Sequence, residues 1–319
     1  MALSAMVAVL AGATALHLVA LLGAGFENQA GWGYAAALAT VWLAAWHTVD
    51  LLIRAAPRDG LGRMLAAAAV PILFGLTVLF LWECGVRGFG SSMMKVILPA
   101  PSAIAGRFAA SLPVLGADFA QTFKGVAVGY LIGCGAGILV AVLIDRSPFL
   151  QQGLLPLGNL VSALPIVGVA PIMVMWFGFD WQSKAAIVVI MTFFPQLVNT
   201  VAGLASAGPM ERDLMKTYAA SYGQTLAALR LPAALPFIFN GLKINSTLAL
   251  IGAIVAEFFG TPIVGMGFRI NTEVGRMNID MVWATILVAA LFGSLFYGLL
   301  ALAERRATFW HASYRQRAA

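Results

Sequence analysis

Apolar residues fill most of this chain in eight long runs, and shorter polar or basic segments separate them. A bilayer-spanning helix needs about 20 mainly apolar residues, and each run approaches or reaches that length. We place the runs at 4–25, 34–54, 64–84, 120–144, 152–176, 184–205, 236–258 and 280–303. The pattern therefore predicts an all-α, polytopic membrane protein with about eight spans.

Two of the runs contain residues that disturb a plain helix. Pro165 and Pro171 lie in the 152–176 run and predict a kinked or broken helix. Lipid tolerates such a break only where protein or a cavity satisfies the freed backbone groups, so packing and cavity lining both stay open. The 120–144 run contains four glycines whose spacing favours close helix packing. They are Gly129, Gly133, Gly135 and Gly137.

The segment at 206–235 is too long and too patterned for a simple turn between spans. Five of its residues follow at steps of three or four and form one apolar stripe if the segment is helical. They are Met215, Tyr218, Tyr222, Leu226 and Leu229. Pro232 and Pro236 would then stop this helix before the next span. The stripe could lie on the lipid surface, pack on the rest of the chain, or fill a groove in a partner.

The charge distribution indicates an orientation in the membrane. Only 10% of the residues are charged, and the net charge is +6. The arginines flank the apolar runs, so they are better explained by membrane topology than by nucleic-acid binding. If eight helices are crossed, the basic segments share one side, at 54–63, 145–153, 206–235 and after 303. The positive-inside rule then predicts both termini in the cytoplasm. Three cations in the 85–119 loop, on the other side, weaken this assignment without reversing it.

The 206–235 segment resembles the cytoplasmic "EAA" loop of bacterial ABC importer permeases. That pattern is Glu-Ala-Ala, three residues, Gly, nine residues, Ile, any residue, Leu-Pro. The run "LRLP" at 229–232 matches its end, and "LPFIFNGLKI" is close to the usual continuation. Counted back from Leu229, the Gly position is Ala219 and the acidic position is Asp213. Ala219 fits poorly if the loop needs a positive φ, so we expect the bend to shift, with Gly223 as the candidate position.

Further stretches resemble the nitrate/sulfonate/taurine branch of these permeases. They are "ILPAPSAI", "MWFGFDWQSKAAIVVIMTFFPQLVNTVAGL" and "IVAEFFGTPIVGMGFRI". The resemblance covers roughly residues 64–305 and implies a type I importer core of six helices in the bacterial inner membrane. Residues 1–60 would add an N-terminal helix pair with a basic linker, and residues 306–319 would form a cytoplasmic tail.

The resemblance also implies partners. A second permease subunit, identical or homologous, would pair with this chain, two ATPase subunits would dock on the cytoplasmic side, and a periplasmic binding protein would deliver the solute. ATP and magnesium would bind to the ATPase, so no cofactor or metal is expected in this chain. The loop at 208–235 would transmit closure of the ATPase to the spans. Its candidate coupling residues are Asp213, Tyr218, Ala219, Ala220, Ser221, Tyr222, Leu231 and Pro232.

Polar residues within the spans are candidates for the translocation path. Asn199, Asn245 and Ser246 could line it or form hydrogen bonds between helices, and Glu257 could be a gate near the outer mouth or a packing contact. His17, in the first run, and His47 with Asp50, in the second, are more simply explained as a neutral interhelical contact and an interfacial anchor.

Enzyme motifs are missing from the sequence. It has no GxxxxGK[ST] phosphate loop, no HExxH and no GxSxG, and its two cysteines, Cys84 and Cys134, have no metal-binding spacing. An ion-coupled secondary transporter is the alternative, but it would need carboxylates deep in the membrane, and these are nearly absent.

The resemblance allows nitrate, taurine, alkanesulfonates, bicarbonate, cyanate, aromatic acids and vitamin precursors such as pyrimidines or riboflavin. The lack of a basic cluster in the spans argues slightly against an anion site.

Overall fold

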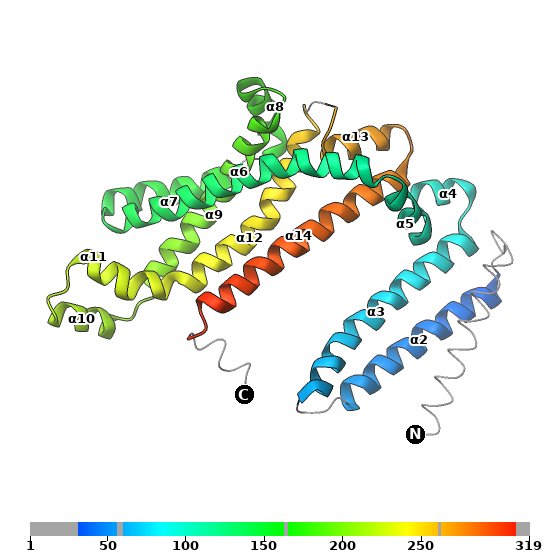
Figure 1. The fold of residues 1–319 in the computed structure, drawn as a ribbon, viewed down its shortest axis with the longest axis horizontal. Coiled ribbons are helices and arrows are strands. Elements are labelled where there is room, and N and C mark those ends of the chain that lie inside the picture. The colour runs from blue at the N-terminus through cyan, green and yellow to red at the C-terminus, as the bar shows by residue number, and fades with distance from the viewer. Residues whose placement is uncertain (1–30, 56–59, 163–164, 261–262, 311–319) are drawn as a thin grey trace. The chain divides into compact units, whose positions relative to one another are not determined.

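A computed structural model describes residues 31–55, 60–162, 165–260 and 263–310, and Figure 1 shows its helices. Every regular element in these ranges is a helix. Six helical segments among them are long and apolar enough to cross a membrane. They are Trp32–Arg54, Ala67–Phe89, Leu112–Asp145, Trp181–Ala205, Tyr222–Glu257 and Ile279–Ala307. The all-α, polytopic architecture is confirmed. The count of eight spans stays a prediction, because the 4–25 run lies outside the described residues.

The chain divides into two structural units, and the first comprises residues 1–110 and 273–284. Its helices include α2 (Trp32–Ala55), α3 (Gly60–Phe89), α4 (Ser92–Ile97) and α5 (Pro101–Ala110). The first two lie antiparallel, because the hydroxyl of Tyr34 at the start of α2 donates to the carbonyl O of Cys84 near the end of α3, at 2.8 Å. The second predicted span therefore packs on the third, across the domain boundary that we expected near residue 60.

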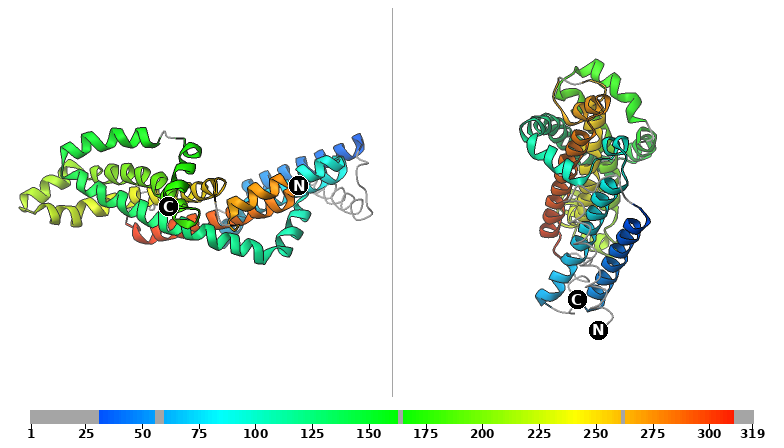
Figure 2. Two further views of the ribbon diagram at one scale, coloured as in Figure 1. Left: turned by 90° about the horizontal axis from the view of Figure 1, so that it is seen from above. Right: turned by 90° about the vertical axis from the view of Figure 1, so that its right-hand side faces the viewer.

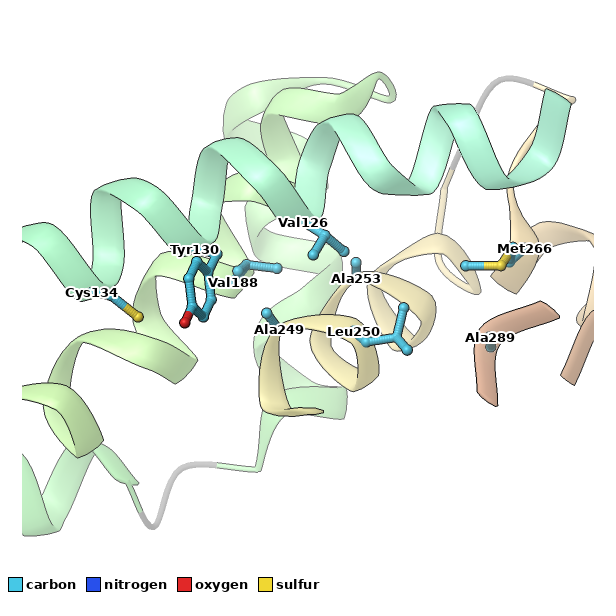
Figure 3. Packing of buried hydrophobic residues seen from close by; sticks show 9 residues of the cluster. All are labelled: Val126, Tyr130, Cys134, Val188, Ala249, Leu250, Ala253, Met266 and Ala289. Atoms are coloured by element: carbon cyan, nitrogen blue, oxygen red, sulfur yellow. The ribbon is translucent and has the colours of Figure 1, made fainter. Parts of the chain in front are cut away.

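The second unit comprises residues 111–272 and 285–319, and three long helices form its centre. They are α6 (Leu112–Asp145), α9 (Trp181–Ala205) and α12 (Leu231–Glu257). Figure 2 shows them packed together, coloured from green to yellow. Figure 3 shows the buried apolar cluster between them, to which Val126, Val188 and Ala253 each contribute from a different helix.

Three of the four glycines predicted to pack closely do so. A Cβ at Gly129 would lie 2.5 Å from the Cβ of Val188, and one at Gly137 would lie 2.7 Å from the carbonyl O of Phe193. A Cβ at Gly133 would overlap the hydroxyl of Thr192. Gly135 is different, because a Cβ there would meet no heavy atom within 4 Å. The glycines therefore set the approach of α6 to α9 on one face of α6 only.

The predicted 152–176 span consists of two helices in the structure. They are α7 (Pro148–Ser162) and α8 (Ile166–Phe177), and neither is long enough to cross a membrane alone. Pro165, in extended conformation, immediately precedes α8, whereas Pro156 and Pro171 are accommodated inside helices. The break that the sequence predicted therefore falls at Pro165.

The span predicted at 236–258 begins much earlier than expected. Helix α11 (Tyr222–Thr225) continues through the π-helical turn η1 (Leu226–Arg230) into α12, so that one helical segment extends over 36 residues. The N–H of Leu231 donates to the carbonyl O of Leu226, five residues back. Pro232 closely follows the π-helical turn, and Pro236 lies further inside α12. Our expectation that these prolines stop a helix was wrong.

The last two helices are α13 (Met266–Gly275) and α14 (Ile279–Ala307). Within the second unit, Phe292 and Phe296 of α14 pack on the apolar cluster of Figure 3. Lys243 of α12 and Glu304 of α14 form an ion pair, with the ammonium N 2.6 Å from the carboxylate O.

Candidate functional site

The segment between α9 and α12, residues 206–230, is here called the connecting segment. It contains two helices at a sharp turn, α10 (Pro209–Thr217) and α11. Pro209 begins α10, Glu211 lies in its first turn and Lys216 in its last, which suits both ends of the helix dipole. The prediction of one apolar stripe assumed a continuous helix. Because the chain turns between α10 and α11, the five residues of the stripe do not lie on a common face.

The turn after α10 is a Schellman motif with alanine in the position that usually holds glycine. The N–H of Ala219 donates to the carbonyl O of Lys216 at 2.8 Å, and that of Ala220 donates to Met215 at 3.0 Å. Ala219 has a φ of 51°, in the left-handed region. The bend therefore stays at Ala219, and our expectation that it moves to Gly223 was wrong, because Gly223 lies inside α11.

The first turn of α11 is fixed by a reciprocal pair of hydrogen bonds. The Ser221 side chain accepts from the N–H of Gln224, and the Gln224 side chain accepts from the N–H of Ser221 at 2.7 Å. Such a capping box satisfies two helix donors that would otherwise have no partner. Ser221, a predicted coupling residue, thus has a structural role at the bend.

Helix α10 exposes an apolar face. Met210 is 81% exposed, Leu214 is 56% exposed and Tyr218, which caps the helix, is 77% exposed. They follow at steps of four and so lie on one side of the helix. Exposed apolar residues are normal when scattered, but a contiguous row on an amphipathic helix marks an interaction surface. We call these three residues the α10 face.

The other end of the connecting segment is fixed to the end of α6. Arg230 contacts both carboxylate oxygens of Asp145, each at 2.5 Å, and its Nε donates to the carbonyl O of Leu204 at 3.1 Å. The hydroxyl of Tyr222 donates to Asp145 at 2.8 Å, and the guanidinium of Arg146 lies over the Tyr222 ring. Both members of the ion pair are 15% exposed. Tyr222 therefore faces its own chain rather than the α10 face.

The remaining predicted coupling residues divide into an exposed and an inward group. Asp213 is exposed and pairs with Lys216 at 2.9 Å. Leu231 and Pro232 are half-buried at the start of α12, where Leu231 packs with Leu226 on a cluster around Leu204.

Two of the predicted path residues are buried in helix packing. Asn245 is fully buried, and its amide N donates to the carbonyl O of Thr192 at 2.9 Å and to Gln196 at 3.3 Å. The amide O of Asn245 has no hydrogen-bond partner among the described residues. Ser246 is also buried, and its hydroxyl donates to the carbonyl O of Lys243 at 2.7 Å.

Glu257 belongs to a buried polar cluster at the opposite end of the unit from Asp145. Its carboxylate accepts from the hydroxyl of Thr122 at 2.8 Å and from the N–H of Gly267 at 2.7 Å. Asp118 is fully buried one turn before Thr122 and pairs with Arg269 at 2.7 Å. These bonds fix the start of α13 to α6 and α12.

Lys184 lies at the same end of the second unit as Glu257. Its ammonium group is buried and donates to the carbonyl groups of Phe179 and Gly260. Nearby, Gln121 donates to Asp180 at 2.7 Å, and this bond, with the N–H of Trp181, lowers the pKa of the Asp180 carboxyl. The sequence analysis placed Lys184 only as the first residue of the run at 184–205.

Asn199 is the one predicted path residue at an open surface. Its amide O accepts from the side-chain amide of Asn240 at 3.1 Å, and this bond is exposed. Sequence reasoning missed Asn240, and it also missed Asp145 and Asp118 as contacts. The available signal was a polar residue inside or at the end of an apolar run, but such a signal does not identify the partner.

Comparison with known proteins identifies the class. The family model described as binding-protein-dependent transport system inner membrane component matches residues 133–309, more than half of the chain. The formylaminopyrimidine transport permease ThiX of Halalkalibacterium halodurans is 30% identical over 244 residues, which are 76% of this chain and 96% of that protein. The riboflavin transport system permease RibX of Chloroflexus aurantiacus is 30% identical over 249 residues, 77% and 91% of the two chains. The putative aliphatic sulfonates permease SsuC of Bacillus subtilis is 28% identical over 246 residues, 76% and 88%.

The helical fold and these relatives together define a membrane permease. The chain belongs to the family of binding-protein-dependent transport system inner membrane components, which confirms the resemblance. It is a non-enzymatic, multi-pass inner-membrane subunit of an ABC importer for small solutes. It works with an ATPase and a binding protein.

Proposed function

We propose that this subunit is driven by its ATPase through the connecting segment, and that the α10 face is the surface that enters the ATPase groove. The observation that carries the proposal is the exposure of Met210, Leu214 and Tyr218 on an amphipathic helix outside the membrane-spanning segments. Burial of such a side chain contributes about 1.5–3 kcal/mol. The three side chains of this short helix would therefore contribute a substantial part of an interface.

The contacts of Arg230 and Tyr222 support the second half of the coupling. They tie the connecting segment to the end of α6 through Asp145, while α11, η1 and α12 form one helical segment. A displacement of the α10 face would thus act on two membrane helices. Ala219, Ala220 and Ser221 shape the bend, Asp213 lies on the exposed surface of α10, and Leu231 and Pro232 begin the helix that carries the movement onward.

The experiment is co-elution of the detergent-purified chain with the ATPase encoded beside its gene. We expect Leu214→Asp and Tyr218→Asp to lower the affinity for the ATPase by about 100-fold, because losing the buried side chain and burying a charge costs about 3 kcal/mol and each 1.4 kcal/mol is a factor of ten. Phe149→Asp is the matched control, since Phe149 is 83% exposed near Asp145 in sequence and outside the connecting segment.

Retention of the ATPase by both α10 variants would remove the α10 face from the interface. If the wild-type chain binds no ATPase, the proposal is wrong, and ion-coupled transport by the chain alone becomes the hypothesis to test. ATP and magnesium bind to the ATPase in this proposal, and the second permease subunit is a copy of this chain or a homologue.

The orientation follows from charge and from the ends of the spans. The ends of α6, α9 and η1 meet at Arg230, so the segments at 145–153 and 206–230 share one side. We place that side, and both termini, in the cytoplasm by the positive-inside rule. The substrate belongs to the range that the relatives' names cover, from sulfonates to formylaminopyrimidine and riboflavin.

A further inference from the structure

The first unit contains a groove between α2 and α3, two helices that both reach membrane-spanning length. The helices pack closely where Tyr34, Val41 and Cys84 form a buried cluster. Towards the C-terminal end of α2 they leave a groove of about 260 Å³ instead. We call it the α2–α3 groove, and its lining includes Trp42, Trp46, Val49, Asp50, Ile53 and Phe74.

The wall of the α2–α3 groove is aromatic and open. The centroid of the Trp42 ring lies 6.3 Å from that of Trp46 and 5.9 Å from that of Phe74. Trp46 is 65% exposed and Phe74 is 52% exposed. Because both helices are of membrane-spanning length, hydrocarbon surrounds these rings unless another protein segment covers them. The groove therefore suits an apolar chain.

One end of the α2–α3 groove is charged. Asp50 follows Trp46 by one helical turn on the same side of α2, and it pairs with Arg54 at 2.8 Å. The two side chains are 39% and 74% exposed, so both keep room for a further partner. A charge is costly deep in hydrocarbon, which places this end at the membrane interface. From Arg54 to Trp42 the helix extends roughly 18 Å, against about 15 Å for half of the hydrocarbon core. The groove therefore extends through about one leaflet.

We propose that the α2–α3 groove binds one phospholipid with a primary amine in its headgroup, from the leaflet on the side of Arg54. The acyl chain lies along Trp42 and Phe74. The ammonium group contacts Asp50 and the face of the Trp46 ring, and the phosphate contacts Arg54. Charge-assisted hydrogen bonds and the attraction of a cation to an indole face both favour this headgroup. The site is independent of the proposed function, because it lies outside the residues that the family model matches.

The charges of the groove distinguish this ligand from other occupants. Asp50 and Arg54 have opposite charges, which match the ammonium and the phosphate of a zwitterionic headgroup. An anionic headgroup without an amine would place a second negative charge beside Asp50, and a choline group has no N–H to donate to the carboxylate. The apolar run at 4–25 lies outside the described residues and is a rival occupant, but it contains no lysine or arginine to pair with Asp50.

Quenching of tryptophan fluorescence by brominated lipids tests the site in the full chain. The chain is reconstituted in phosphatidylcholine vesicles with a rising fraction of brominated phosphatidylethanolamine, phosphatidylcholine or phosphatidylglycerol. The quenching that Trp42→Phe removes belongs to the groove. Trp32→Phe is the matched control, because Trp32 is 92% exposed at the other end of α2. We expect the groove to bind phosphatidylethanolamine about fivefold more tightly than phosphatidylglycerol, with phosphatidylcholine between them. Asp50→Asn should abolish this preference, whereas Asp50→Glu should keep it.

Three outcomes would overturn the proposed lipid site. If Trp42→Phe changes the quenching by none of the lipids, protein fills the groove, either the run at 4–25 or a second copy of the chain. Equal binding of the three headgroups would show a groove that recognises acyl chains alone. A preference that survives in Asp50→Asn would place the recognition of the amine elsewhere. The vesicles contain no ATPase, so none of these results bears on the proposed function.

Discussion

Ala219 holds a backbone conformation that usually belongs to glycine. Its φ of 51° costs an L-residue about 1–2 kcal/mol relative to the right-handed region. The Schellman hydrogen bonds from Ala219 and Ala220 hold it there. Counting from Leu229 placed the Gly position of the family pattern at Ala219, but we expected the bend elsewhere, because the sequence could not show that two hydrogen bonds outweigh the strain on one methyl group.

Ala219→Gly should therefore stabilise the bend. Glycine relieves the strain but adds freedom to the unfolded chain, so the net gain is about 0.5–1 kcal/mol. Ala220→Gly is the matched control. Ala220 has no positive φ, so glycine relieves no strain there and should destabilise the bend by about 0.5–1 kcal/mol. Limited trypsin cleavage at Lys216 measures the difference. Faster cleavage of the Ala219→Gly variant would show that the bend is not strained.

At the scale of elements, the sequence predicted where helices lie better than where they end. The apolar runs located α6, α9 and α12, because apolar residues over such a length have few alternatives in a membrane. The stripe in the connecting segment failed because the three-to-four spacing continues through Ala219, where the chain turns. The proline stop failed because a π-helical turn before Pro232 accommodates the missing N–H within one helix.

The packing of α6 on α9 gives a prediction for this scale. Gly133→Ala should destabilise the protein by about 1–3 kcal/mol, because the added Cβ overlaps Thr192. Gly135→Ala should be neutral or slightly stabilising, because its Cβ meets open space and alanine favours a helix. Thermal unfolding of the detergent-solubilised protein compares the two. Equal melting temperatures would mean that the glycine face does not set the helix contact.

At the scale of the whole molecule, the Asp145–Arg230 pair joins elements 85 residues apart. Periodicity cannot predict such a contact, since each residue alone is an ordinary charge at the end of an apolar run. The same limit explains why Asp118 and Lys184 were missed at the other end of the unit. A pattern along the chain finds the elements, whereas these partners depend on how the elements pack.

Asp145→Asn should weaken this connection while it leaves the α10 face intact. The unpaired Arg230 is mostly buried, so we expect a loss of about 1–3 kcal/mol in stability. Asp213→Asn removes a carboxylate from a pair that is 70% exposed or more and should cost less than about 1 kcal/mol. In proteoliposomes, the Asp145→Asn transporter should keep its ATPase but lose stimulation by the binding protein. Stimulation as in the wild type would exclude the pair from the coupling route.

The unbroken helical segment from Tyr222 to Glu257 has a mechanical consequence. Its 36 residues extend over roughly 54 Å, against about 30 Å of hydrocarbon, so one end projects well beyond the lipid. Asn245 is bonded to α9, and we take it as the fulcrum. The arm from Tyr222 to Asn245 is then roughly 35 Å long, and the arm to Glu257 is roughly 18 Å. A sideways movement of Tyr222 would then be transmitted to Glu257 with about half the displacement and about twice the force. A large force over a short distance suits the opening of the tightly bonded polar cluster around Glu257.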